Sequence, residues 1–170
     1  MINRKQIPKC LAPYCIAFEK SVGAIIFCNV NSKIQFLLIK YRSGHWEFPR
    51  GRVEDDETEY ETMKREIKEE TNISQLQIIE GLRESMSFSY KAHGQELINR
   101  KRDGNCMYVH KRVVFYLAQT LNKEVIISHE HQQFRWLEFD DAYEKLTFQN
   151  AKLVLKEANR YLLENVLIKY

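Results

Sequence analysis

Residues 51–73, GRVEDDETEYETMKREIKEETNI, hold the pattern on which the fold and the chemistry of this chain depend. Within this stretch, residues 57–71 have the spacing of an amphipathic helix, with Tyr60, Met63 and Ile67 as an apolar stripe. An apolar stripe on a helix needs a partner surface that removes it from water. We therefore expect this helix to pack against a sheet.

Acidic side chains gather on the same helix. Glu66, Glu69 and Glu70 stand at positions i, i+3 and i+4, which places their carboxylates on one face. Like charges at this spacing cost an isolated helix roughly 0.2–0.5 kcal/mol per pair, so the cluster favours a compensating cation. Mg²⁺ prefers oxygen ligands and suits such a site, and Mn²⁺ is a second possibility. The alternative is a solvated acidic helix face. At the start of the helix, Asp56 is expected to be the N-cap, with Glu59 three positions later.

The rest of the chain predicts an α/β (α+β) fold, in which a mixed β-sheet is sandwiched between helices. Residues 21–28 and 35–39 are apolar runs of strand length on either side of a turn-rich segment, as in a hairpin. Further strands are expected at 76–79, 86–90, 113–118 and 134–137. A closing helix carries the apolar positions Ala151, Val154, Leu155, Ala158 and Leu162.

Length and composition predict a single domain over residues 1–170. The sequence is 44% hydrophobic and 29% charged, with no apolar run of membrane-spanning length, so we expect no membrane association. Its 26 basic and 23 acidic residues give a net charge of +3, far below that of a dedicated nucleic-acid-binding protein. The segment 92–110, AHGQELINRKRDGNCMYVH, is basic and aperiodic, and predicts a long surface loop.

The N-terminus and the cysteines bear on the cellular compartment. Residues 1–18 read as an N-terminal extension with basic and no acidic residues, which gives weak support to organelle targeting. The four cysteines, at positions 10, 15, 28 and 106, form no CxxC pair and no zinc-binding spacing. We expect them to be reduced thiols in a cytoplasmic protein.

The spacing Gly-x5-Glu-x7-Arg-Glu-Ile-x-Glu-Glu-x-x-Ile in residues 51–73 resembles the Nudix box. One position departs from it, because Asn72 stands where the family has glycine. That position follows the helix end and is expected to be left-handed, a conformation that asparagine tolerates best after glycine. The fold implied by the resemblance is the Nudix fold, with a loop-helix-loop metal site.

The resemblance also implies roles within the box. Glu66 and Glu70 match the positions that bind the divalent metal, the carbonyl of Gly51 matches a further ligand, and Glu69 matches a catalytic carboxylate of the same cluster. Two other residues, Glu57 and Arg65, match an ion pair that supports the site. The implied reaction is hydrolysis of a nucleotide pyrophosphate linkage by a metal-activated water.

Segments outside the box narrow the resemblance. The stretches GHWEFPRGRVE (44–54) and ISHEHQQFRWLEFDDA (127–142), with the closing helix, look like asymmetrical diadenosine tetraphosphate hydrolases of the animal and archaeal type. Those enzymes split their substrate into ATP and AMP. Glu130, in the second stretch, matches a carboxylate that approaches the metals, and is a candidate extra ligand or general base. Phe48 departs from the proline common at its position.

Candidate substrate-binding residues follow from the same resemblance. Lys111 matches a phosphate-binding lysine, and Arg50 stands where that group usually has lysine. Phe88 matches a tyrosine that stacks on adenine, and Tyr90 on the same strand face offers a second ring. His45 matches a position near the substrate. Lys111 and Arg50 also have a simpler reading as surface charges, and Phe88 and Tyr90 as core aromatics.

Two other functions stay open. The basic residues of 99–102 (NRKR) and 110–112 (HKR) favour a Nudix enzyme that acts on the RNA 5′ end, as a pyrophosphohydrolase or decapping enzyme. A non-catalytic nucleotide-binding module on the same fold is the third possibility. The sequence implies no obligate protein partner.

Overall fold

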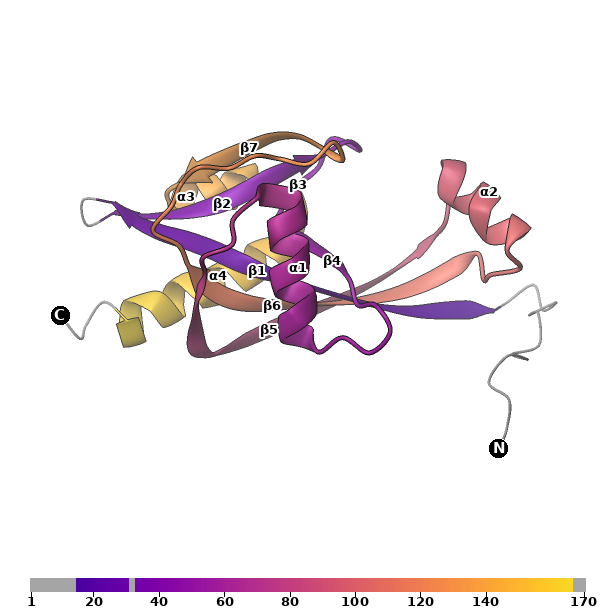
Figure 1. The fold of residues 1–170 in the computed structure, drawn as a ribbon, viewed down its shortest axis with the longest axis horizontal. Helices are drawn as coiled ribbons and strands as arrows, with labels where there is room; N and C mark the ends of the chain where they lie inside the picture. The colour runs from indigo at the N-terminus through magenta and orange to yellow at the C-terminus, as the bar shows by residue number, and fades with distance from the viewer. Residues whose placement is uncertain (1–14, 31–32, 167–170) are drawn as a thin grey trace. The chain divides into compact units, whose positions relative to one another are not determined.

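The computed structural model describes residues 15–30 and 33–166, which form one seven-stranded sheet with helices (Figure 1). The sheet has the order β3-β2-β1-β6-β5, with β4 paired to β1 and β7 paired to β2. The strands are β1 (Ile16–Val30), β2 (Lys33–Tyr41), β3 (Trp46–Glu47), β4 (Arg50–Arg52), β5 (Gln77–Lys91), β6 (Tyr108–Gln119) and β7 (His131–Leu137). The helices are α1 (Glu59–Thr71), α2 (Gly94–Arg102), α3 (Phe139–Lys145) and α4 (Gln149–Tyr161), which a π-helical turn (Leu162–Val166) follows.

The predicted hairpin is confirmed. Strands β1 and β2 pair antiparallel with Phe27 opposite Phe36 and Val30 opposite Lys33. Consecutive residues of both strands are buried over 21–28 and 36–39, so this part of the sheet is covered on both faces. The predicted arrangement of a sheet between helices is therefore confirmed.

Helix α1 packs on one face of the sheet, as its apolar stripe predicts (Figure 1). Met63 and Ile67 are fully buried there, whereas Tyr60 is about half exposed and belongs to the rim of the interface. The core beneath the helix combines residues of β1, β2 and β6 with α1 and with Ile73 at the C-terminal end of the box. Its buried members are Val22, Ala24, Ile26, Leu37, Met63, Ile67, Ile73, Val114, Tyr116 and Ala118.

The expected N-cap of α1 is wrong by two residues. Asp56 has a φ of 70°, which is left-handed and unsuited to an N-cap. Thr58 is the cap, in an extended conformation, and forms a capping box with Glu61 instead of Glu59. At the other end, Asn72 has a φ of 60° and a ψ of 10°, which confirms the left-handed conformation expected where the family has glycine.

A salt bridge joins the loop before α1 to the helix itself. Arg65 donates from Nε to Glu57 Oε1 at 2.6 Å and from its terminal nitrogen to Oε2 at 2.8 Å, so the two groups pair as a fork. The same guanidinium donates to the Arg52 carbonyl at 3.0 Å. Glu57 also accepts from the Thr62 hydroxyl at 2.8 Å. The predicted supporting pair is present, and it fixes the loop and the helix against each other.

The other strands and the closing helix differ in detail from the prediction. The two short strands expected at 76–79 and 86–90 form one strand, β5, which continues through Gly81 at a φ of 95°. The hydroxyl of Tyr161 in α4 donates to the Glu80 carbonyl at 2.7 Å, beside this glycine. All five predicted apolar positions of the closing helix are buried, and α3 packs against β2 and β7.

The described chain divides into two compact units. The smaller, here called the minor unit, contains residues 15–19 and 87–112 of the described chain, and the larger contains 20–86 and 113–166. The surface loop predicted at 92–110 is wrong, because α2 occupies residues 94–102 and β6 begins at 108. No residue of α2 is buried, so the helix leaves no apolar stripe in the sequence by which it could have been recognised.

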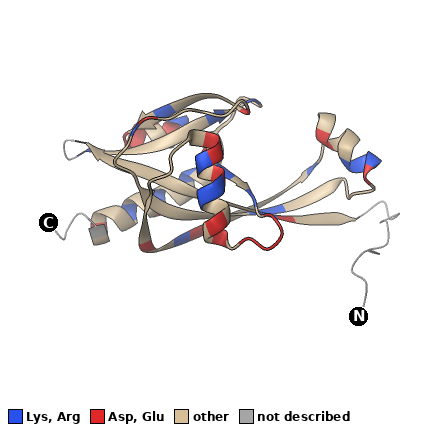
Figure 2. Cartoon of the chain, in the orientation of Figure 1, with Lys and Arg blue, Asp and Glu red and all other residues tan. Residues whose placement is uncertain are grey.

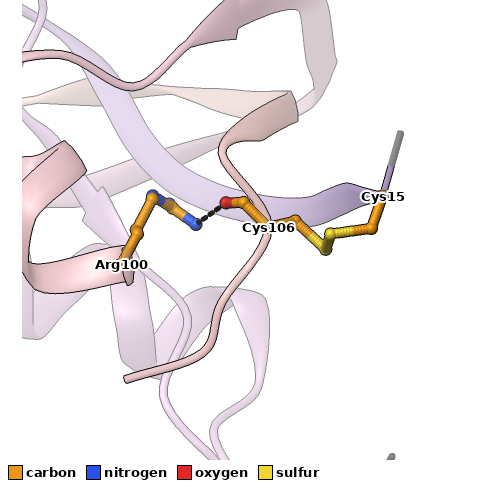
Figure 3. Close-up of a disulfide and its surroundings, with 3 residues drawn as sticks. All are labelled: Cys15, Arg100 and Cys106. Atoms are coloured by element: carbon orange, nitrogen blue, oxygen red, sulfur yellow. Dashed lines mark hydrogen bonds between the residues drawn. A yellow bond between two sulfur atoms is a disulfide. The ribbon is translucent and has the colours of Figure 1, made fainter. Parts of the chain in front are cut away.

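Polar contacts and a disulfide hold the minor unit together. Arg100 in α2 forms ion pairs with Glu19 and Glu96, the latter at 2.7 Å. Cys15 and Cys106 are joined by a disulfide, and Arg100 donates to the Cys106 carbonyl at 3.3 Å (Figure 3). The expectation that these two cysteines are reduced thiols is wrong, since 91 residues separate the partners and their spacing alone gives no sign of pairing. Cys28 is free and buried, and Cys10 lies outside the described residues.

The N-terminal prediction lies mostly outside the described residues. Residues 1–14 of the expected extension are not described, whereas 16–18 belong to β1. Within 15–30 and 33–166, no helix is both long and apolar enough to cross a lipid bilayer.

We expect Cys106→Ser to lower the thermal stability of the protein. The bond closes a long loop, and loss of such a disulfide typically costs about 2–4 kcal/mol. Melting curves of the wild type with and without dithiothreitol, and of the variant, measure the effect. The reductant should lower the melting temperature of the wild type and leave the variant unchanged. An equal response of both proteins to the reductant would contradict the assignment of the disulfide.

The Arg65 guanidinium lowers the pKa of Glu57 from 4.5 to about 2, with help from the Thr62 hydroxyl and the Glu54 amide. Its ionised form therefore stabilises the fold above about pH 4.5, and this contribution is lost as the pH falls toward 2. Glu57→Gln should lower the melting temperature at pH 6, and the difference from wild type should shrink between pH 4.5 and 2. Glu69→Gln is the control, because that carboxylate is exposed. A difference independent of pH would contradict the argument.

Candidate functional site

The candidate site is built around a close approach between a glycine and a carboxylate. Strand β4 pairs with β1, with Gly51 opposite Val22, and this pairing holds the glycine beneath α1. A Cβ atom at Gly51 would overlap the carboxylate of Glu66. Glycine is therefore required at position 51 for the Glu66 carboxylate to reach the backbone there.

Glu66 lies among other acidic side chains and beside Arg65. Its side chain is mostly buried, and Arg65 donates to its Oε1 at 2.8 Å. Burial raises the pKa of Glu66, Arg65 acts against this, and the charges of Glu70 and Glu69 raise it further. A cation at this point would offset the cost of burying the Glu66 carboxylate and the repulsion between it and the other two carboxylates.

Glu70 is buried and anchored on both sides. Its Oε2 accepts from the backbone N–H of Arg50 at 2.9 Å, which ties the helix to β4. Its Oε1 lies 3.3 Å from Nε2 of His131, and its carbonyl accepts from the Ser128 amide at 3.1 Å. The His131 Nδ1 contacts the Ser128 hydroxyl at 3.0 Å. The segment before β7 is thus held at the C-terminal half of α1.

The third carboxylate of the helix is placed differently. Glu69 has 61% of its side chain exposed, and it contacts Arg65 at 3.5 Å. The structure therefore brings Gly51, Glu66 and Glu70 together and leaves Glu69 at the surface. Figure 2 shows further acidic positions in the loop before α1, next to this helix.

The site fits a hard divalent cation in its donor chemistry. Two carboxylates and a backbone carbonyl supply oxygen atoms, and the missing Cβ of Gly51 lets the Glu66 carboxylate lie against the backbone there. Among the described residues, no three histidine, cysteine or acidic side chains converge on one point. A metal ion here would therefore complete its ligands with waters and substrate phosphates, as Mg²⁺ commonly does.

A cluster of rings and one guanidinium lies beside these carboxylates in the larger unit. The ring of Tyr41 stacks on His45 at 4.6 Å, meets His131 edge-on at 4.6 Å, and has the Arg50 guanidinium above it at 5.6 Å. The Tyr41 hydroxyl donates to the Phe48 carbonyl at 3.2 Å. Two candidate substrate-binding residues, His45 and Arg50, are thus brought to one place through a tyrosine that sequence reasoning missed.

His45 is prepared to act as a neutral imidazole. Burial lowers its pKa to about 4, and the electrostatic influence of Arg50 and of His131 acts in the same direction. Its Nδ1 contacts the Ser43 hydroxyl at 2.6 Å, whereas Nε2 is buried without a hydrogen-bond partner. Nε of Arg50 is likewise buried and unpartnered. A buried polar atom without a hydrogen-bond partner destabilises the folded protein until a ligand forms a hydrogen bond with it.

Glu47 is a second residue that sequence reasoning missed. It is buried in β3, accepts from the Phe48 amide at 3.2 Å, and has a buried Oε2 without a partner. Burial raises its pKa to about 7, although the positive charge of Arg50 acts against this. A glutamate between Trp46 and Phe48 in the sequence was the available signal, since ionisable side chains are rarely placed in such apolar runs.

Glu130 is exposed on the turn before β7. Its amide donates to the Ser128 hydroxyl at 3.3 Å, and its carbonyl accepts from the Arg42 amide at 3.3 Å. The neighbouring His129 is exposed, and its carbonyl accepts from Arg42 Nε at 2.7 Å. The backbone of this turn is therefore anchored, and the carboxylate of Glu130 faces solvent.

The remaining predicted binding residues belong to the minor unit. Phe88 and Tyr90 lie on β5 with ring centroids 6.1 Å apart, and Tyr90 donates to Glu96 at 3.1 Å. Lys111 is half-buried on β6. Their part in substrate binding stays a prediction.

Known proteins resemble this chain over most of its length. A family model described as the NUDIX domain matches residues 17–157. The bis(5'-nucleosyl)-tetraphosphatase [asymmetrical] of Mus musculus is 36% identical over 138 residues, which are 78% of this chain and 83% of that protein. The solved binary complex of a C. elegans Ap4A hydrolase superposes with a TM-score of 0.70 at 31% identity, and covers 85% of this chain and 98% of the other.

A shorter likeness concerns a different activity. An RNA pyrophosphohydrolase of Pseudoalteromonas translucida is 39% identical, but over 56 residues, which are 33% of this chain and 31% of that protein. The family model, by contrast, spans both the carboxylate helix and the segment before β7. The chain therefore belongs to the Nudix hydrolase family.

Proposed function

We propose that this Nudix hydrolase cleaves a dinucleoside tetraphosphate asymmetrically, and that diadenosine tetraphosphate is converted to ATP and AMP. The observation that carries the proposal is the 36% identity to the mouse tetraphosphatase over 83% of that enzyme. The closeness of Glu66 to Gly51 and the hydrogen bond from the Arg50 amide to Glu70 support it further. In the reaction, a water oxygen bonds to phosphorus, a bridging P–O bond breaks, and the two nucleotides separate.

Nudix hydrolases use a divalent metal, and we propose Mg²⁺ for this chain, with Mn²⁺ as a substitute. Glu66, Glu70 and the Gly51 carbonyl would hold it, with Glu130 as a further ligand once substrate is bound. A bound ion of this kind offsets the charge on the leaving phosphate and favours ionisation of the attacking water. Arg65 donates to Glu66 and orients it, and Glu57 keeps Arg65 in place.

The chain's own side chains would bind and orient the substrate. The neutral Nε2 of His45 and the Nε of Arg50 are buried and unpartnered, so they can contact phosphate oxygens without first breaking another hydrogen bond. We assign Lys111 to a phosphate distant from the attacked one, and Phe88 and Tyr90 to the adenine ring, where stacking is worth roughly 1–3 kcal/mol. The proton of the attacking water would pass to a carboxylate, for which Glu130 and Glu69 are the exposed candidates.

A panel of substrates tests the proposal against its alternatives. The purified protein is incubated with Mg²⁺ and dinucleoside polyphosphates, nucleotide sugars, triphosphorylated RNA and capped RNA, and the products are separated by chromatography. ATP and AMP from the tetraphosphate are expected to form fastest. Faster removal of 5′ phosphates from RNA would favour the second candidate, which the local likeness to an RNA pyrophosphohydrolase supports. No hydrolysis of any substrate would leave a non-catalytic binding module.

The cellular compartment is proposed to be the cytoplasm. The Cys15–Cys106 disulfide weighs against this proposal, because such bonds persist mainly in oxidising compartments. Alkylation of thiols in intact cells, followed by mass spectrometry, decides the question. Free thiols at both positions would support the cytoplasm, and an oxidised pair would overturn it.

Glu66→Gln and Glu70→Gln should each lower kcat by several powers of ten, because each removes one negative ligand and little volume. The fold should survive, and the melting temperature without metal should stay level or rise, since like charges no longer crowd the helix. Glu157→Gln, an exposed acidic residue of α4, is the control. Wild-type turnover in either site variant would refute the assignment.

Glu130→Gln should lower kcat far more than it raises KM, because both proposed roles of this carboxylate act in the chemical step. Stability without metal should stay nearly unchanged, since the side chain is exposed. Glu124→Gln, on the same loop region, is the control. A kcat within about threefold of wild type, or roughly 0.7 kcal/mol in the barrier, would return the general-base role to the box.

A further inference from the structure

One face of the minor unit carries aromatic and basic side chains in the open. Alternate residues of a strand point to the same face, so six residues share one side of neighbouring strands β1, β6 and β5. They are named here the open face: Ile16, Phe18, Ser89, Lys91, Tyr108 and His110. Phe18 is 81% exposed, Ile16 54% and Tyr108 41%, which is unusual for large apolar groups gathered in one place.

The opposite face of the same strands is covered by α2. Arg100 of that helix pairs with Glu19 of β1, and Glu96 accepts from Tyr90 of β5. Val109, between Tyr108 and His110, is fully buried. The unit is thus a sheet with a helix on one side, and no described element of the minor unit itself covers the other side.

Contacts within the open face keep its rings ordered. The Phe18 ring lies 5.6 Å from the His110 ring, and Nδ1 of His110 contacts the Ser89 hydroxyl at 3.0 Å. The Lys91 amine lies 5.6 Å from the centre of the Tyr108 ring. A shallow hollow of about 460 Å³ opens between these strands, and it is lined by Ile16, Ser89, Tyr90, Lys91, Tyr108 and Val109.

The charge of the minor unit is positive. Residues 15–19 and 87–112 hold six lysines and arginines against three acidic residues, Glu19, Glu96 and Asp103. Lys91 lies on the open face itself, whereas Arg100, Lys101 and Arg102 belong to α2 on the opposite side. Figure 2 shows basic positions at the end of α2 and along the neighbouring strands. Because the whole chain has a net charge of only +3, the minor unit is a local concentration of positive charge.

From this geometry we propose that the open face binds single-stranded nucleic acid. Rings exposed on a sheet offer stacking surfaces for unpaired bases, and nearby cations attract the phosphate backbone. A peptide of acidic residues would satisfy the charge but has no aromatic rings to stack on Phe18 and Tyr108. The chain's own residues 1–14 hold basic groups and no acidic one, so charge disfavours them as the occupant. The proposal does not rest on the substrate assigned to the catalytic site.

Fluorescence anisotropy tests the proposal with the full-length, oxidised protein and a labelled single-stranded oligouridine of about 12 nucleotides, a length within the range covered by one such surface. EDTA is present throughout, so hydrolysis does not contribute. Binding should weaken as salt rises, and each phosphate contact should add about 0.7 to the slope of log K against log salt. Phe18→Ala and Tyr108→Ala should each weaken binding about tenfold, and Tyr108→Phe should retain it.

A matched pair of lysine variants distinguishes binding at the open face from non-specific electrostatic attraction of a polyanion to the protein. Lys91→Gln should weaken binding and lower the salt slope. Lys123→Gln should change neither, although Lys123 also lies over an aromatic ring, that of Trp136 at 5.8 Å, in the larger unit. The proposal is overturned by no anisotropy change at low salt, by full binding in both alanine variants, or by equal losses in the two lysine variants. Preference for a polyglutamate peptide over the oligonucleotide would overturn it in favour of an acidic protein partner.

Discussion

The pairing of Arg65 with Glu57 is the interaction on which the site depends. One guanidinium holds the loop before α1, the Arg52 carbonyl and the Glu66 carboxylate at the same time. It therefore sets the distance between β4 and the helix, which in turn brings Glu66 over Gly51. Arginine stays protonated at any physiological pH. The support that Arg65 gives to the site is therefore the same whether or not the nearby carboxylates bind a cation. A lysine could supply the charge but not the fork that reaches three acceptors.

Much of this arrangement could be predicted from the sequence because it is local. The supporting ion pair and the two carboxylates lie on one loop and the helix that follows it. The spacing along this short segment determines which of Glu57, Arg65, Glu66 and Glu70 can meet. The left-handed Asn72 was predictable for the same reason. The helix start was not, because Asp56 and Thr58 are both good capping residues, and the left-handed backbone at Asp56 decides between them.

What could not be predicted depends on residues distant in the sequence or on weak patterns. Helix α2 buries none of its residues and is held by ion pairs with β1 and within itself, so hydrophobic periodicity could not reveal it. The disulfide joins residues 91 positions apart. Tyr41 lies opposite His131 across a register shift between Lys40 and Tyr41, where β7 has one residue more than β2. Such a shift changes which side chains of the two strands face each other and leaves no trace in the sequence.

The bond between Cys15 and Cys106 also makes part of the chain a covalent ring. Residues 15–106 contain β1 to β5 and α1, hence every box residue, whereas β7, α3 and α4 lie on the tail outside it. A single cut of the backbone anywhere inside the ring leaves one molecule with all its parts attached. A cut in the tail releases a fragment at once. While the bond is intact, one cleavage inside the ring thus cannot separate the segment that carries Gly51, Glu66 and Glu70 from the tail that carries Glu130.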